Sequence, residues 1–172
     1  METTKNKTTL LIMAAGMGSR FGSLKQLALL GPHKKTLLHY SIYDAVHAGF
    51  DKIVFIIRRS FENEFKEAVG KYAESLVETV YCFQEMDQLP GNLPPIQREK
   101  PWGTAHAIWA AKDHIHEPFI AINADDFYGR DAFVKMHDFV ASNTDERCFS
   151  LAGYRLAATL SENGTVSRGI GT

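Results

Sequence analysis

The most constraining feature of this sequence is an apolar run that ends in a glycine-rich bend. Residues 10–15 are apolar throughout, which is typical of a buried strand. Gly16 and Gly18 follow, and glycines let backbone N–H groups turn toward a bound anion. Arg20 and Lys25 add positive charge where a polyphosphate would lie. The segment therefore indicates a strand that leads into a nucleotide-binding loop.

Strand and helix patterns alternate along the rest of the chain. Apolar runs predict strands at 10–15, 52–57, 77–83, 119–124 and 148–154. Apolar residues at helical spacing, with Gly49 as a natural stop, predict helices at 38–49, 60–72, 104–115 and 131–140. This order predicts an α/β fold, a doubly wound and mostly parallel sheet with helices on both faces.

Length and composition predict one domain with a substantial core. The chain has 172 residues, of which 45% are hydrophobic, and we expect a single domain over residues 1–172. Residues 161–172 begin a new turn-and-strand pattern and then stop, which predicts truncation at the C-terminal end. Residues 84–101 are proline-rich and predict a long loop. Such loops are more often functional than idle, although a flexible insertion is also compatible with the pattern.

The charge balance argues against two classes of partner. The 19 Lys and Arg residues nearly balance the 20 Asp and Glu residues, so a net charge of −1 favours neither nucleic acid nor an anionic membrane. No segment is apolar enough to cross a bilayer, and the polar N-terminus does not resemble a signal peptide. Cys82 and Cys148 follow no metal or disulfide spacing, which fits a reducing compartment. We expect a cytoplasmic protein, and the sequence leaves its oligomeric state open.

Two common glycine-rich loops do not match the bend. A P-loop requires G-x-x-x-x-G-K-[ST], and the sequence has no such string. A dinucleotide loop requires G-x-G-x-x-G, but Phe21 stands at the third glycine position. The second predicted strand also closes with Arg58 and Arg59 instead of an acidic residue that would hold a ribose. A nicotinamide or flavin site is therefore disfavoured, and we expect both arginines at a solvated strand end.

A third kind of loop does match. The motif A-A-G-x-G-S-R at residues 14–20, followed by Lys25, resembles the signature of the nucleotidyltransferase superfamily. That superfamily includes the sugar-1-phosphate nucleotidylyltransferases, or nucleotide-sugar pyrophosphorylases. Leu24 stands where many members have proline, a departure that affects only the stiffness of the loop. The resemblance extends from residue 10 to about residue 154 and implies a nucleotide-diphospho-sugar transferase-like, Rossmann-like three-layer α/β/α fold.

A second segment is similar to the part of the family that faces the base. Residues 100–107, KPWGTAHA, resemble the family's G-T-A-x-A segment, in which the glycine backbone lies against the base. A Cβ on Gly103 would collide with a base held flat against the chain. Gln84 is the nearest match to a glutamine that reads the base in the family. His106 has two interpretations, as a residue that orients base or acceptor and as an ordinary helix histidine.

A third segment carries paired carboxylates. The predicted strand at 119–124 ends in Asp125 and Asp126, which are hard oxygen ligands of the kind that Mg²⁺ prefers. The resemblance implies that Asp125 holds a catalytic Mg²⁺, with Asp126 beside it at the metal site. His114 and His116 diverge on a helix, so we expect them at the surface. Each segment alone also fits a structural interpretation as a turn, helix start or solvated strand end, but all three occur in the family's order.

The resemblance implies a site and a reaction. Arg20, Lys25 and Asp125 would be the catalytic residues. The nucleotide would be bound by Ala14, Ala15, Gly16, Met17, Gly18, Ser19, Arg20, Lys25, Gln84, Trp102, Gly103 and Thr104. The expected reaction is Mg²⁺-dependent transfer of a nucleotidyl group from a nucleoside triphosphate to a phosphorylated acceptor, by default a sugar 1-phosphate, with release of pyrophosphate.

One other function stays open at this point, and a further one is disfavoured. Members of the family usually carry a second metal-binding aspartate and an acceptor-binding segment beyond the position of residue 172. A nucleotide-binding or regulatory module of the same fold is therefore the main alternative. A glycosyltransferase would need an Asp-x-Asp motif, and Asn123-Ala124-Asp125 is not one. The sequence does not identify the base or the acceptor.

Overall fold

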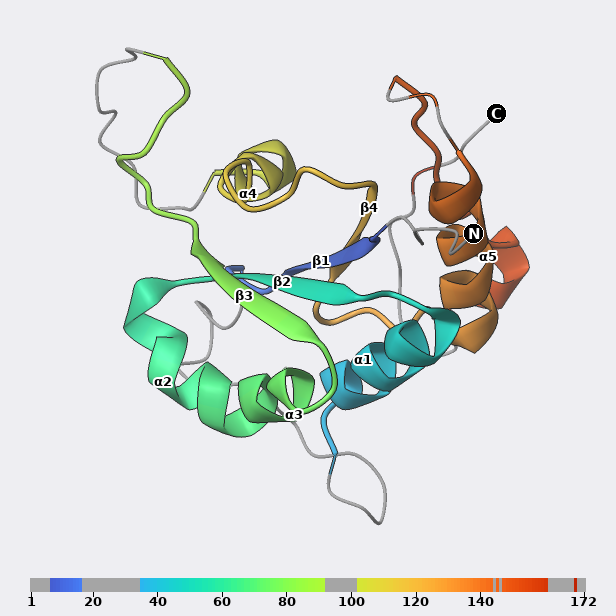
Figure 1. The fold of residues 1–172 in the computed structure, drawn as a ribbon, viewed down its shortest axis with the longest axis horizontal. Helices are drawn as coiled ribbons and strands as arrows, with labels where there is room; N and C mark the ends of the chain where they lie inside the picture. Colours follow the sequence, from blue (N-terminus) through green and yellow to red (C-terminus); the bar gives the residue numbers. More distant parts are fainter. Residues whose placement is uncertain are drawn as a thin grey trace, which may run out of the picture.

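The structure of the protein is a computed structural model, drawn as a ribbon in Figure 1. It describes residues 7–16, 35–91, 102–143, 145, 147–160 and 169. Several predicted site residues lie outside the described residues, namely Met17, Gly18, Ser19, Arg20 and Lys25. The same holds for the second half of the predicted loop at 84–101 and for nearly all of the final segment, 161–172.

A parallel sheet forms the centre of the fold. Its strands are β1 (Thr9–Met13), β2 (Lys52–Ile57), β3 (Glu78–Phe83) and β4 (Phe119–Asn123). They lie in the order β3-β2-β1-β4, and every pairing between neighbours is parallel. Because β1 lies between β2 and β4, its last residue Met13 is opposite both Ile56 and Asn123. The predicted parallel sheet is confirmed.

Helices cover both faces of this sheet (Figure 1). One face carries α1 (Leu37–Ala48), α5 (Arg130–Ser142) and a helical stretch made of η2 (Arg59–Phe61), α2 (Glu62–Phe65), η3 (Lys66–Gly70) and α3 (Lys71–Glu74). The other face carries α4 (Thr104–Trp109), which continues as turns through residue 114 where the sequence predicted helix. The doubly wound α/β architecture is therefore confirmed.

Alternate side chains of the strands point to opposite faces of the sheet and pack into two separate cores. Leu10 and Ile12 of β1 point toward α1 and α5, and they are fully buried with Ile53 and Phe55 of β2. Leu11 points the other way, toward α4. Two small residues one helical turn apart, Ala107 and Ala111, make the contact from that side and let the backbone approach the sheet closely. The central strands are thus buried on both faces, as their unbroken apolar runs predict.

Helix α1 ends where the sequence predicts. Gly49 adopts the left-handed conformation, with φ 114°, and its N–H donates to the carbonyls of Ala45 and Val46 at 3.1 Å. A Cβ at position 49 would lie 2.8 Å from the ring of His137 on α5. Glycine is therefore required here by both the backbone conformation and the close packing of the two helices.

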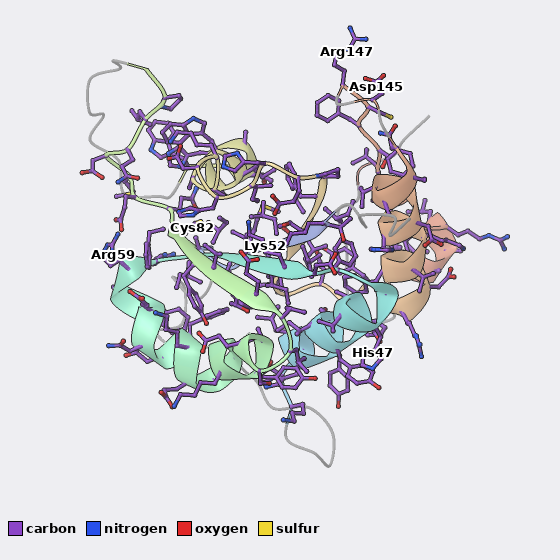
Figure 2. The ribbon with its side chains drawn as sticks, in the orientation of Figure 1. His47, Lys52, Arg59, Cys82, Asp145 and Arg147 are labelled. Atoms are coloured by element: carbon purple, nitrogen blue, oxygen red, sulfur yellow. The ribbon has the colours of Figure 1, made fainter. Side chains whose placement is uncertain are left out.

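The prediction of a strand at 148–154 is wrong. Residues 148–155 form no regular structure and are exposed, and only the short η4 (Leu156–Thr159) follows. Phe149 and Leu151 are 93% and 94% exposed. An alternating pattern forms a strand only where a neighbouring edge accepts its backbone hydrogen bonds, and no described strand pairs with this segment. Figure 2 shows the preceding ion pair of Asp145 and Arg147 beyond the end of α5.

Candidate nucleotide-binding site

The parallel strands bring their carboxyl ends to one edge of the sheet. The segments that leave β1, β2, β3 and β4 at this edge begin with residues that include Gly16, Arg58, Gln84 and Asp125. Lys52 and Arg59, labelled in Figure 2, mark the first residue of β2 and a position just beyond its carboxyl end. Ligands of open α/β sheets bind outside the carboxyl ends of the strands, so this edge is the expected place for a site.

A cavity of about 290 Å³ opens at this edge, on the side of the sheet that carries α4. It is lined by Met13, Ala15, Gly16, Gln84, Trp102, Gly103, Thr104, Ala107, Asn123 and Asp125. Most of the described residues that the sequence predicted for the site are in this set. Ala14 instead lies buried in the core beneath α1, and Asp126 does not line the cavity.

The start of the glycine-rich bend is held from β2. The N–H of Ala14 donates to the carbonyl of Ile56 at 2.8 Å, which extends the parallel ladder by one bond. One residue further, Arg58 Nε donates to the carbonyl of Ala15 at 2.7 Å. Because a trans peptide holds its C=O and N–H in opposite directions, the N–H of Gly16 points away from Arg58. The arginine therefore sets the orientation of the first peptide of the bend.

Gly103 lines the cavity at the start of α4. Its φ of −70° is accessible to any residue, and a Cβ placed there would meet no atom of the described residues within 4 Å. Among these residues, neither backbone strain nor packing therefore requires glycine at this position. The open space is compatible with a ligand that lies against the backbone, and the contact of Gly103 with a base stays a prediction.

Gln84 lies directly beyond β3 and is 8% exposed. Its backbone N–H donates to the carbonyl of Ile57, and its side chain lines the cavity. Side-chain Nε2 donates to the carbonyl of Trp102 at 2.9 Å and lies 3.2 Å from His106 Nδ1. Through these contacts, Gln84 joins the end of β3 to Trp102 and His106 at the start of α4.

The two aspartates beyond β4 have different surroundings. Asp125 is exposed and lines the cavity beside Asn123, and no described hydrogen bond or ion pair involves its carboxylate. Asp126 accepts a hydrogen bond from Asn123 Nδ2 at 2.8 Å and lies 3.5 Å from the Tyr128 hydroxyl. Burial raises the pKa of Tyr128 to about 12, since with the Asp126 charge it outweighs the hydrogen bond from the Asn123 N–H, which lowers the pKa. Asp126 therefore stabilises the turn after β4, whereas Asp125 faces the cavity.

The described protein residues could supply only some of the ligands of a magnesium ion. Within the described ranges, no group of three or more His, Cys, Asp and Glu residues is arranged to hold a metal. Mg²⁺ commonly uses one or two carboxylates and takes its other ligands from phosphates and water. The Asp125 carboxylate, exposed in the cavity, meets that requirement when a nucleotide supplies the phosphates.

Sequence reasoning missed the role of Arg58. The prediction that Arg58 is solvated is wrong, since Arg58 bonds to Ala15 across the β1–β2 pair. Only its neighbour behaves as predicted, because Arg59 is largely exposed and lies over the ring of Phe83. The missing signal was the strand order, which no local pattern contains. His114 and His116 are exposed, as predicted.

The fold and the cavity together define an open, parallel α/β protein with a candidate ligand site at the carboxyl ends of its strands. The sequence profile of the nucleotidyl transferases matches residues 9–169, which is almost the whole chain. The chain therefore belongs to the nucleotidyl transferase family.

One sequence relative agrees with this assignment, and solved structures share the fold. Over 130 residues, the chain is 28% identical to UTP–glucose-1-phosphate uridylyltransferase of Bacillus subtilis strain 168. The aligned region covers 67% of this chain and 43% of that protein. UDP-glucose pyrophosphorylase in complex with UDP-glucose superimposes with a TM-score of 0.51 at 21% identity, over 77% of this chain and 53% of that one. A Bacillus anthracis protein assigned as a glucose-1-phosphate thymidylyltransferase gives a TM-score of 0.56 at 18% identity, over 77% and 50% of the two chains. The chain thus spans about half the length of the relatives it matches.

Proposed function

We propose that this chain catalyses transfer of a nucleotidyl group from a nucleoside triphosphate to a sugar 1-phosphate, with release of pyrophosphate. The single observation that carries the proposal is the cavity at the carboxyl edge of the sheet. Gly16 of the phosphate-binding motif, Gln84 and Gly103 of the predicted base site and the Asp125 carboxylate all line it, although they come from four separate segments. Both the family and the uridylyltransferase relative favour transfer over binding alone.

The proposed reaction needs alignment and charge stabilisation more than acid–base chemistry. An ionised phosphate oxygen of the acceptor attacks the α-phosphorus of the triphosphate, and pyrophosphate leaves. The nucleophile is already anionic at neutral pH, so no general base or covalent intermediate is needed. In this proposal, the backbone at 16–20 and the Arg20 side chain bind the β- and γ-phosphates. Lys25 neutralises the charge that grows on the α-phosphate.

We assign Asp125 as the residue that holds Mg²⁺ with the nucleotide phosphates. When bound, the ion would supply positive charge to the phosphate oxygens. Asp125 is the described carboxylate in the cavity, which supports this choice over Asp126.

We place the reaction in the cytoplasm. Cys82 and Cys148 are both free, and one of them is exposed, which suits a reducing compartment. In the part of the chain that the structure describes, no helix has the length and apolar character needed to span a bilayer.

A coupled assay of pyrophosphate release tests the proposal. The purified chain is mixed with Mg²⁺, glucose 1-phosphate and each of the common nucleoside triphosphates in turn. We expect release that requires protein, triphosphate and acceptor together, and that stops when the metal is chelated. Failure of every triphosphate to give acceptor-dependent pyrophosphate would overturn the proposed function.

A further inference from the structure

The two ring nitrogens of His106 have different hydrogen-bonding partners. Nε2 lies 2.5 Å from the backbone carbonyl of Gln88. A carbonyl oxygen can only accept a hydrogen bond, so Nε2 must carry the proton of the neutral ring. Nδ1 then has a lone pair and accepts from Gln84 Nε2 at 3.2 Å. The tautomer of His106 is thus determined by the loop that follows β3.

This tautomer in turn determines the orientation of the Gln84 side-chain amide. Its Nε2 has two hydrogens, of which one goes to the carbonyl of Trp102 and the other to His106 Nδ1. A flipped amide would place Oε1 against two acceptors at once, which is repulsive. The remaining polar atom, Oε1, has no donor among the described residues, and Gln84 lines the cavity.

The His106 ring is itself held in place by aromatic neighbours. Its centroid lies 6.1 Å from that of Trp102 and 5.5 Å from that of Trp109. Trp102 is anchored in addition by a hydrogen bond from its indole nitrogen to the carbonyl of Met86 at 3.0 Å. The ring that receives the Gln84 hydrogen bond therefore lies in a defined position.

We propose that His106 is a positioning residue for base selection, because it holds Gln84 so that the amide offers only an acceptor to the nucleotide. Opposite the ring nitrogen of the pairing edge, an acceptor favours a base with a hydrogen on that nitrogen, such as uracil, thymine, guanine or hypoxanthine. At the same point it disfavours cytosine and adenine, whose ring nitrogen is bare and whose amino hydrogens lie to one side of it. This inference rests on the proposed function, since it assumes that the base occupies the Gln84 side of the cavity.

Two pairs of nucleotides matched in size test the proposal. Binding constants of UTP and CTP, and of ITP and ATP, are measured by titration calorimetry in the presence of Mg²⁺. We expect UTP to bind at least about tenfold more tightly than CTP, and ITP than ATP, because the disfavoured base leaves Oε1 facing another acceptor. Equal binding within both pairs would overturn the inference.

Substitutions at His106 separate positioning from a structural role. His106→Phe keeps a ring but removes the acceptor, so we expect the ratio of UTP to CTP affinity to fall several-fold. His106→Asn places an amide oxygen near the position of Nδ1, and we expect it to restore the ratio. His114→Phe makes the same change at an exposed position outside the cavity and serves as the control. An unchanged ratio in His106→Phe would overturn the proposal.

One further variant applies even if His106→Phe does not fold. Gln84→Met preserves the length of the side chain without its amide, and we expect it to bind UTP and CTP with similar affinity. A full preference for UTP in this variant would contradict the proposal. If wild-type protein binds none of the four nucleotides and neither dTTP nor GTP, the proposed function fails and the inference fails with it. Binding without preference overturns the inference alone.

Discussion

Two adjacent arginines show how different neighbouring residues of one segment become in the folded chain. Arg58 turns back across the sheet to the carbonyl of Ala15, at the start of the glycine-rich bend. Arg59 lies over the ring of Phe83 and pairs with Glu85 at 3.3 Å on the surface. Only the first can influence the peptide whose N–H leads into the proposed phosphate site.

We predict that Arg58→Met weakens triphosphate binding about tenfold. The variant loses the hydrogen bond to the carbonyl of Ala15, and a hydrogen bond from a charged donor contributes about 1.5–3 kcal/mol. Without it, the first peptide of the bend is no longer held in one orientation. Arg59→Met removes the same charge from the neighbouring position and should change binding less than twofold. Calorimetric titration with the Mg²⁺ complex of the preferred triphosphate measures both. Equal losses in the two variants would show that Arg58 acts only through net charge.

Lys25, which lies outside the described residues, is a second single residue whose proposed role can be tested. We predict that Lys25→Ala lowers turnover about a hundredfold or more, while the dissociation constant of the triphosphate changes little. The reason is that its charge is needed most where negative charge grows on the α-phosphate. Lys71→Ala, at an exposed position paired with Glu67, is the control. If turnover and affinity fall together, Lys25 only binds the substrate.

At the scale of elements, one carboxylate links the amino ends of three neighbouring strands. Glu117, just before β4, accepts hydrogen bonds from the Thr9 hydroxyl on β1, from Lys52 Nζ on β2 at 3.0 Å and from the His116 N–H. Burial raises the pKa of Glu117, but these hydrogen bonds and the Lys52 charge outweigh it and lower the pKa to about 2. The group therefore links three strands at the edge opposite the cavity.

A depressed pKa gives this linkage a defined pH dependence. Its stabilisation is fully present above the ordinary glutamate pKa of about 4.5 and is lost as the pH falls toward about 2. We predict that wild type loses about 3 kcal/mol more of its free energy of unfolding across this window than Glu117→Gln does. Urea unfolding at several pH values measures the difference. Glu67→Gln, which changes an exposed carboxylate, should leave the slope of wild type intact.

At the scale of the whole molecule, the core and the segment that follows α5 differ in burial. Phe133 of α5 is 3% exposed in the larger core, whereas Phe149 and Leu151 are almost fully exposed. All three are large apolar residues within regular patterns. Burial, and not the pattern, determines what each contributes to stability.

We predict that Phe149→Ser and Leu151→Ser each change the free energy of unfolding of this chain by less than about 0.5 kcal/mol, as expected for surface positions. Phe133→Ala should cost about 3–5 kcal/mol, because it leaves a cavity between α5 and the sheet. Chemical denaturation of the purified variants compares them directly. A loss of several kcal/mol in Phe149→Ser would mean that the segment packs as the sequence pattern suggested.

The sequence by itself determined the four strands of the sheet and the order of strands and helices along the chain. Unbroken apolar runs identified β1 and β2, since a strand covered on both faces has no polar side, and Gly49 marked the end of α1 through its left-handed backbone. Parallel topology then placed Gly16, Gln84 and Asp125 at one edge, because parallel strands end together. These are consequences of local pattern and chain direction.

Only the tertiary structure decided which side chains meet across that edge. The hydrogen bond from Arg58 to Ala15, the orientation of Gln84 by His106 and the separation of Asp126 from the cavity all depend on neighbours distant in the chain or on the shape of a turn. The segment at 148–154 has a strand pattern but no described strand to pair with. A local pattern states what a segment can bury or bond, whereas the fold decides whether a partner is there.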